Sequence, residues 1–272
     1  MKVSNPVELN SGEIDFALCR SILYEVLSVG FREPTPETLR RLTSKDQIAF
    51  LIEAATLLDR QFPTSNRESL LSFIHPFTGF SNIDQLEMLQ NSYHKLFGHV
   101  AHAKVPPYET EYGEETLFQQ PQQLGDISGF LNAFGVKLNT EKHERFDHVS
   151  CECEFLCFLT RKEAYGLEQK NETMYRETRN AERLFLRDHL GRFVPSFVKL
   201  LRRENPGGFY SILGDLCYSF VFRECEYFKV PMGPETMRLR PLIPMDECLT
   251  CGAGEEGKRT IEMVKPQESE SP

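Results

Sequence analysis

An apolar stripe after Asp147 constrains the fold of this chain more than any other feature of its sequence. The stripe residues fall at i, i+4, i+7, i+8, i+11, i+15 and i+18: Val149, Cys153, Leu156, Cys157, Thr160, Ala164 and Leu167. This spacing is typical of one buried face of an α-helix. Asp147 stands where an N-cap is expected, and Glu152 lies near the positive end of the helix dipole. The segment 147–167 is therefore predicted to be a long helix.

Helical patterns with start and stop signals fill most of the chain up to about residue 229. Caps are expected at Asn10 or Ser11, at Thr35 before Pro36, and at Ser44. Further helices are expected over residues 68–75, 83–97, 124–134, 172–189, 191–204 and 207–228. No alternating run of β-branched residues is long enough to predict a strand. We predict an all-α fold: a single-domain helical bundle of about eight to ten helices over residues 1–230.

The composition changes at about residue 231. Residues 231–272 are rich in Pro, Gly, Glu and Lys and contain few large apolar side chains. Too little apolar surface is present to offset the entropy of ordering such a segment. We expect an extended, largely disordered C-terminal tail, which carries the Cys248-x-x-Cys251 motif.

Charge and apolar content exclude several classes of protein. The net charge of −9 opposes nucleic-acid binding, which calls for a basic face. The first residues lack the apolar region of a secretory signal, and no run of about 18 apolar residues predicts a membrane span. We therefore expect a cytoplasmic protein.

In that reducing compartment the eight cysteines are expected to be thiols. Cys19, Cys217 and Cys225 lie in apolar helical stretches and are predicted to be small core residues. A lone C-x-x-C supplies only two of the four ligands of a structural zinc, so Cys248 and Cys251 are weak metal candidates. Cysteines from the cluster 151–157 would have to complete such a site.

Motifs for catalysis are missing from the sequence. It contains no G-x-S-x-G, no G-x-x-x-x-G-K-[ST] and no G-x-G-x-x-G. His143, Glu144, His148, Glu152 and Glu154 cluster, but only His148 and Glu152 would share a helical face. A polar helix surface is the preferred interpretation, and we predict a protein that is not an enzyme and needs no cofactor or metal.

The segment 105–113, Val-Pro-Pro-Tyr-Glu-Thr-Glu-Tyr-Gly, interrupts the helical pattern. Its two prolines fix their own φ and favour extended geometry in the residue before each. A stiff loop is therefore expected to present its two tyrosines and two glutamates, Tyr108, Glu109, Glu111 and Tyr112. Such a loop is suited to recognition, and the alternative is a buried crossover whose tyrosines only pack.

Asp147 and His148 form a second candidate contact. An aspartate at a helix start accepts from free N–H groups, and a histidine beside it can change its charge near neutral pH. The pair is suited to a cationic ligand at the mouth of a groove. A plain helix cap remains the alternative.

Several segments, in this order, resemble one known family. The most specific are Pro-Pro-Tyr-Glu-Thr-Glu-Tyr at 106–112 and Asp-His-Val-Ser-Cys-Glu-Cys-Glu-Phe at 147–155. Phe-Leu-Asn-Ala-Phe-Gly at 130–135 and Phe-Leu-Arg-Asp-His-Leu at 185–190 accompany them. Over roughly residues 14–225 the chain looks like the TorD/DmsD family of cytoplasmic chaperones for molybdenum-cofactor enzymes, to which NarJ-type assembly factors are related.

The resemblance implies an all-helical, non-enzymatic monomer or homodimer. Its partner would be the catalytic subunit of a DMSO-reductase-type molybdoenzyme, bound in part through a twin-arginine signal peptide until the cofactor is inserted and export is safe. Tyr108, Glu109, Glu111, Tyr112, Asp147 and His148 would bind this client. The physics agrees, because guanidinium groups pair with carboxylates beside an apolar surface.

Two departures from the family are visible. The chain contains no Trp, and the C-terminal Cys248-x-x-Cys251 is not a general family feature. Two alternatives remain open at this point. One is a thiol- or zinc-dependent redox or metal protein, and the other is a permanent subunit of an oxidoreductase complex.

Overall fold

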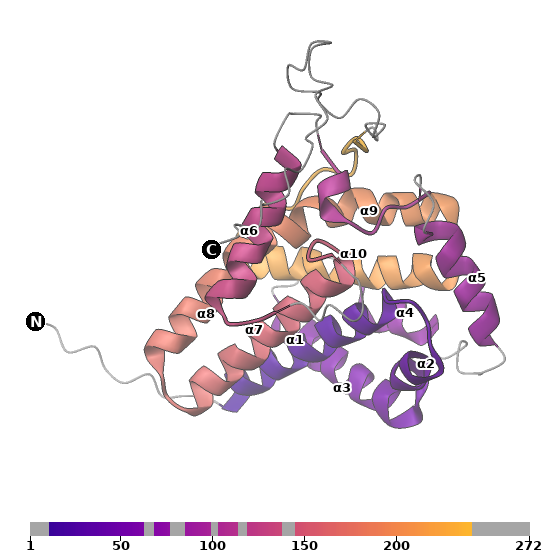
Figure 1. The fold of residues 1–272 in the computed structure, drawn as a ribbon. Coiled ribbons are helices and arrows are strands. Elements are labelled where there is room, and N and C mark those ends of the chain that lie inside the picture. The colour runs from indigo at the N-terminus through magenta and orange to yellow at the C-terminus, as the bar shows by residue number, and fades with distance from the viewer. Residues whose placement is uncertain are drawn as a thin grey trace, which may run out of the picture. The chain divides into compact units, whose positions relative to one another are not determined.

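The computed structural model describes residues 11–62, 68–76, 85–98, 103–113, 119–137 and 145–240, and these residues are almost entirely helical (Figure 1). Their α-helices are α1 (Ser11–Gly30), α2 (Pro36–Thr43), α3 (Lys45–Gln61), α4 (Leu70–Ile74), α5 (Leu86–Phe97), α6 (Gln119–Ala133), α7 (Val149–Glu168), α8 (Glu172–Phe185), α9 (Gly191–Glu204) and α10 (Phe209–Phe228). No strand occurs in these ranges, where the only β pairing is isolated bridges. The predicted all-α fold is confirmed.

Local signals in the sequence set several helix ends. Thr35 and Thr38 form a capping box at the start of α2, with Pro36 in its first turn. The Ser44 side chain accepts a hydrogen bond from the Gln47 amide and caps α3. α10 ends where Lys229 adopts a left-handed conformation at φ 54°. The predicted caps at Thr35 and Ser44 are confirmed.

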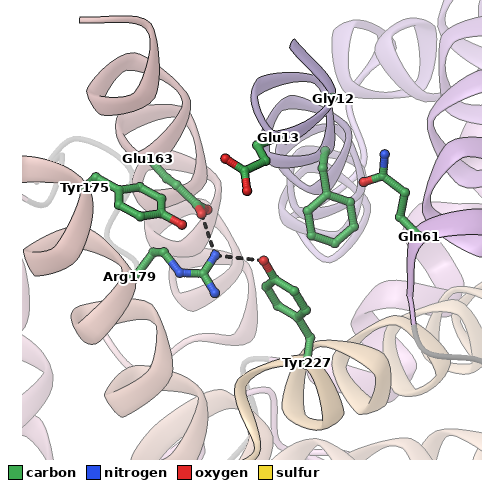
Figure 2. A pocket seen from close by; sticks show the side chains of 8 residues that line it. Gly12, Glu13, Gln61, Glu163, Tyr175, Arg179 and Tyr227 are labelled. Carbon is green, nitrogen blue, oxygen red and sulfur yellow. Dashed lines mark hydrogen bonds and ion pairs between the residues drawn. The ribbon is translucent and has the colours of Figure 1, made fainter. Parts of the chain in front are cut away.

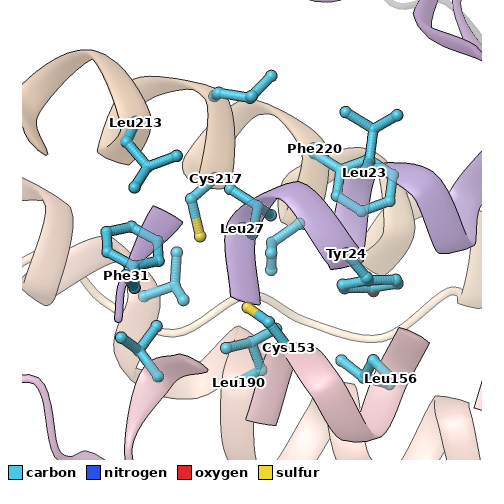
Figure 3. Packing of buried hydrophobic residues seen from close by; sticks show 14 of the residues in the cluster. Leu23, Tyr24, Leu27, Phe31, Cys153, Leu156, Leu190, Leu213, Cys217 and Phe220 are labelled. Carbon is cyan, nitrogen blue, oxygen red and sulfur yellow. The ribbon is translucent and has the colours of Figure 1, made fainter. Parts of the chain in front are cut away.

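The core lies where α1, α7 and α10 meet. α1 packs along α7, α7 packs against α8, and α9 packs against α10. Figure 3 shows the contributions of these helices to the core, among them Leu27 of α1, Cys153 of α7 and Cys217 of α10. Cys217 and Cys225 are buried as predicted, whereas Cys19 is partly exposed.

One charged residue lies at the centre of this apolar contact. Arg20 of α1 is fully buried and binds Glu224 of α10 through two hydrogen bonds of 2.8 and 2.7 Å. Its guanidinium also binds Glu163 of α7 at 2.5 Å and Glu182 of α8. A single cation therefore joins four helices, and its position is fixed by hydrogen bonds to three carboxyl groups.

Between Phe185 and Gly191 the chain makes a π-helical turn, which includes His189, and it continues directly into α9. The sequence predicted two helices with a break at residue 190. A Cβ at Gly191 would lie 2.4 Å from the Leu186 carbonyl oxygen and 2.9 Å from the Cys225 sulfur. Only glycine permits α9 to begin this close to α10.

The compact unit formed by the helices continues to Arg240, ten residues beyond the predicted boundary at 230. Residues 231–240 form an irregular segment with a turn at 235–236, and they make hydrogen bonds to α9 and to the loop 103–113. The rest of the predicted tail, with Cys248 and Cys251, lies outside the described residues. In the ranges that are described, no helix has the length and apolar content needed to cross a membrane.

Candidate functional site

The loop 103–113 is fixed to the helical body at both ends. The Val105 amide donates to the Leu96 carbonyl at 3.0 Å, and the Tyr112 hydroxyl donates to the Pro106 carbonyl at 2.8 Å. The Tyr112 ring is fully buried and packs against Phe193 of α9. The loop is therefore held in one conformation, as its prolines predicted.

The structure brings the loop and the Asp147–His148 pair together. The Glu109 amide donates to the Asp147 carbonyl at 2.8 Å, and the Val149 amide donates to the Pro107 carbonyl at 2.8 Å. An antiparallel bridge joins Tyr108 to His148, and the two rings meet edge to face. The six predicted residues thus occupy two paired segments.

Glu109 is fully buried and bound to α9 and to the π turn before it. Its carboxylate accepts from Arg192 at 2.6 and 3.1 Å and contacts His189 Nδ1 at 3.0 Å. Burial alone would raise the pKa of Glu109, but the hydrogen bond and charge of His189 and the Arg192 guanidinium outweigh it and hold this pKa below its usual value. Glu109 is therefore ionised and already neutralised by its own chain.

Asp147 is also buried and paired. Its carboxylate accepts from the Thr110 amide at 3.2 Å and hydroxyl at 2.7 Å, and from Arg145 at 3.0 and 2.7 Å. These partners draw the side chain away from the helix that follows. The prediction that Asp147 caps this helix is wrong, since the cap falls one residue later.

His148 is the N-cap of α7. Its Nδ1 accepts from the Ser150 amide at 3.1 Å, so the imidazole takes the place of the usual carboxylate or hydroxyl. Burial, with the nearby charges of Arg32 and Arg145, lowers the pKa of His148 to about 3. The prediction that His148 changes charge near neutral pH is therefore wrong, because the ring stays neutral there.

Tyr108 and Glu111 are the two predicted residues with partly exposed side chains. The Arg145 guanidinium lies 4.4 Å from the centre of the Tyr108 ring and 3.8 Å from Glu111. Burial raises the pKa of Glu111, Arg145 lowers it and Asp147 raises it, and the net direction is upward. These three side chains form the solvent-facing part of the predicted site.

Glu152 of α7 lies behind the loop, where the sequence predicted a residue that favours the helix dipole on a polar helix surface. It is fully buried, and neither carboxyl oxygen has a hydrogen-bond partner among the described residues. Burial raises its pKa well above the usual value, and the charges of Glu109 and Asp147 raise it further. The buried Glu152 carboxyl therefore favours its protonated form, next to Glu109, whose pKa is lowered.

Thiol and metal chemistry find little support among the described residues. Burial raises the pKa of Cys157 to about 11 and that of Cys225 to about 12, and this disfavours the reactive thiolate. In the described ranges, no group of three or more His, Cys, Asp and Glu side chains is arranged to hold a metal. His143 and Glu144, like the tail cysteines, lie outside these ranges.

A cavity lies apart from the loop. It has a volume of about 220 Å³ and is lined by residues of α1, α3, α7, α8 and α10. Figure 2 shows Arg179 in its wall, bonded to Glu163 at 2.6 Å and to the Tyr227 hydroxyl at 2.9 Å. None of the six predicted site residues lines it.

Comparisons with known proteins agree with this structure. The family model for the nitrate reductase delta subunit matches residues 59–199, which include the loop, Asp147 and His189. The chain is also 26% identical over 212 residues to the perchlorate reductase assembly chaperone protein of Dechloromonas aromatica (strain RCB). That alignment covers 76% of this chain and 89% of the relative.

The fold and these matches assign the chain to the all-helical NarJ/TorD-type chaperones of molybdoenzymes. Within that class it belongs to the nitrate reductase delta subunit family. The resemblance inferred from the sequence motifs is thereby confirmed.

Proposed function

We propose that this protein is a cytoplasmic chaperone that binds the catalytic subunit of a molybdenum-cofactor oxidoreductase and assists cofactor insertion before export. The family match over residues 59–199 carries this proposal, because it spans the whole of the loop site. The relative named as a perchlorate reductase assembly chaperone supports it. In this role the protein binds a client and catalyses no reaction.

We further propose that the client's twin-arginine leader contacts the exposed part of the site, at Tyr108 and Glu111. Arg145 makes its short hydrogen bonds to Asp147 and lies 3.8 Å from Glu111, so Glu111 remains available to a second guanidinium. Partial burial of Glu111 reduces solvent screening and strengthens such a pair. Glu109, Tyr112, Asp147 and His148 then act by holding the loop in place.

Calorimetry with the leader peptide of the molybdoenzyme encoded beside this protein tests the proposal. We expect micromolar binding that weakens with added salt, and roughly ten-fold weaker binding after Glu111→Gln, the loss of one partly screened ion pair. Glu177→Gln, on the exposed face of α8, is the matched control. Equal binding of the leader and its Lys-Lys variant would reject arginine recognition.

A permanent subunit is distinguished by stoichiometry. A chaperone should co-purify with the cofactor-free catalytic subunit and be released once the cofactor is loaded. Size-exclusion chromatography of the two co-expressed proteins, with and without molybdenum in the medium, measures this. Retention at a fixed ratio in the loaded enzyme would show a structural subunit instead.

A further inference from the structure

The irregular segment 231–240, here called the strap, crosses the first turns of α9. The Gly233 amide donates to the Gly191 carbonyl at 3.0 Å. This carbonyl is free to accept because Pro195, four residues later, has no N–H to donate to it. A Cβ at Gly233 would lie 1.9 Å from the Arg192 carbonyl oxygen, so glycine is required at this crossing.

Beyond this crossing the strap pairs with the loop. The Ser196 hydroxyl donates to the Pro234 carbonyl and accepts from the Met237 amide, both at 2.8 Å. The Gly113 amide then donates to the Arg238 carbonyl, and the Arg240 amide donates to the Glu111 carbonyl, both at 2.9 Å. These two bonds flank an antiparallel bridge between Tyr112 and Leu239. Residues 238–240 thus pair with the edge of the loop in an isolated antiparallel bridge.

The strap is attached mainly through its backbone. Arg238 is exposed, and Leu239 keeps 40% of its surface in solvent. Arg240 lies closer to the body, where one of its terminal nitrogens donates to Gln123 of α6 at 3.1 Å. Because few apolar groups of the strap's last residues are buried, their removal leaves the helical core intact.

We propose that this edge of the loop is the docking site for an extended, arginine-containing segment of the client, and that the strap occupies it until the client displaces residues 238–240. The inference rests on the proposed function and specifies how the leader binds. It adds the backbone of Glu111 and Gly113 to the contacts of the Glu111 side chain.

The chemistry of the edge identifies its partner. The Glu111 carbonyl and the Gly113 amide can pair with the backbone of any extended peptide, as in other complexes where a peptide adds a strand. Selectivity comes from side chains, and the present occupant has the sequence Arg-Leu-Arg at 238–240. Its last arginine lies beside Gly113 and donates a hydrogen bond to Gln123. Burial and the charge of Arg192 lower the pKa of this arginine, and the charge of Glu109 opposes them. A leader with adjacent arginines offers the same groups.

Variants of the full chain test the displacement. Ser196→Ala removes two hydrogen bonds to the strap and leaves the loop unchanged, whereas Ser21→Ala removes a buried serine bond inside α1 and serves as control. The probe is a labelled synthetic peptide with an Arg-Arg pair followed by an apolar stretch. Without these two hydrogen bonds the strap should be detached from the loop in a larger fraction of molecules, and the loop edge is then open to the peptide. Ser196→Ala should therefore bind this peptide roughly three- to ten-fold more tightly than wild type. Ser21→Ala should bind it like wild type.

Amide hydrogen exchange of the wild-type chain gives an independent measurement. On peptide binding the Arg240 amide should lose its protection, because its acceptor on Glu111 is taken, while the Gly113 amide stays protected by the peptide backbone. Peptide binding with an unchanged Ser196→Ala affinity and a protected Arg240 amide would overturn the displacement and leave the proposed function standing. If wild type and Ser196→Ala both fail to bind the peptide, both proposals fail.

Discussion

The buried cluster around Arg20 yields a prediction with opposite outcomes for two neighbouring glutamates. Glu224 accepts two hydrogen bonds from Arg20 and one of 2.9 Å from the Tyr24 hydroxyl. Glu182 accepts from the same guanidinium with one oxygen, while its other oxygen has no partner among the described residues. Burial raises the pKa of Glu182 to about 8, against the opposing charge of Arg20. Glu182 is therefore protonated at pH 7, and glutamine matches that form in shape and charge.

The sign of the pH effect follows from the proton count. Between the usual carboxyl pKa of 4.5 and about 8, folded Glu182 keeps a proton that the unfolded chain releases. This side chain therefore lowers stability as pH rises through that window, by at most about 1.4 kcal/mol per pH unit. Glu182→Gln has no proton to lose, so its stability relative to wild type should increase over the same range. Near pH 4.5 the two should differ by less than about 1 kcal/mol.

Glu224→Gln provides the contrast. It breaks a buried, doubly hydrogen-bonded charge pair and should cost about 3–5 kcal/mol at pH 7. Urea unfolding of wild type and the two variants at pH 5, 6, 7 and 8 measures all three stabilities. The reasoning is refuted if both variants lose the same stability at pH 7, or if the difference between Glu182→Gln and wild type does not change with pH.

Three further predictions concern the loop, the thiols and the tail. Asp147→Asn should destabilise the fold by about 2 kcal/mol in urea, because an amide cannot accept all the bonds from Arg145 and Thr110. The thiols of Cys153, Cys217 and Cys225 are buried, so a thiol reagent at pH 8 should modify them more slowly in the native protein than in the unfolded protein. Mass spectrometry of the labelled peptides measures both rates. Truncation after Arg240 should leave Tm within a few degrees of wild type, whereas truncation after Lys229 removes the strap and should lower it further. Zinc at about one per chain in untagged full-length protein would instead show that Cys248 and Cys251 bind a metal.

The helices could be predicted from the sequence because the residues that signal them lie close together in the chain. A capping threonine before a proline and an apolar stripe at helical spacing each involve residues within one or a few turns. The segment 191–204 was predicted with the bounds that α9 has. The break predicted at residue 190 is wrong, because the chain continues through a π-helical turn into α9. The reason is nonlocal: Gly191 permits a close approach to α10, and sequence spacing carries no information about that contact.

The polar networks could not be derived in the same way. Glu109 is 80 residues from His189 and 83 from Arg192, and Arg20 is 204 residues from Glu224. Helical spacing tells which face a charge occupies but not which helix covers it. One signal was available, since Arg20 falls on the apolar face of α1 between Phe16 and Tyr24. A charge within such a stripe must be paired, so a buried partner was a fair expectation.

The same physics separates residues that hold the site from residues that can contact a client. Glu109 and Asp147 are buried, and each is bonded to an arginine of its own chain. A client that bound them directly would have to leave those arginines unpaired, at about 1–3 kcal/mol or more for each lost partner. Contact at the partly exposed Glu111 and the backbone of Gly113 carries no such cost, because the strap that now covers this edge is itself a peptide. In the proposal made above, the buried carboxylates therefore support the loop, and the client is recognised at the loop edge that the strap now covers.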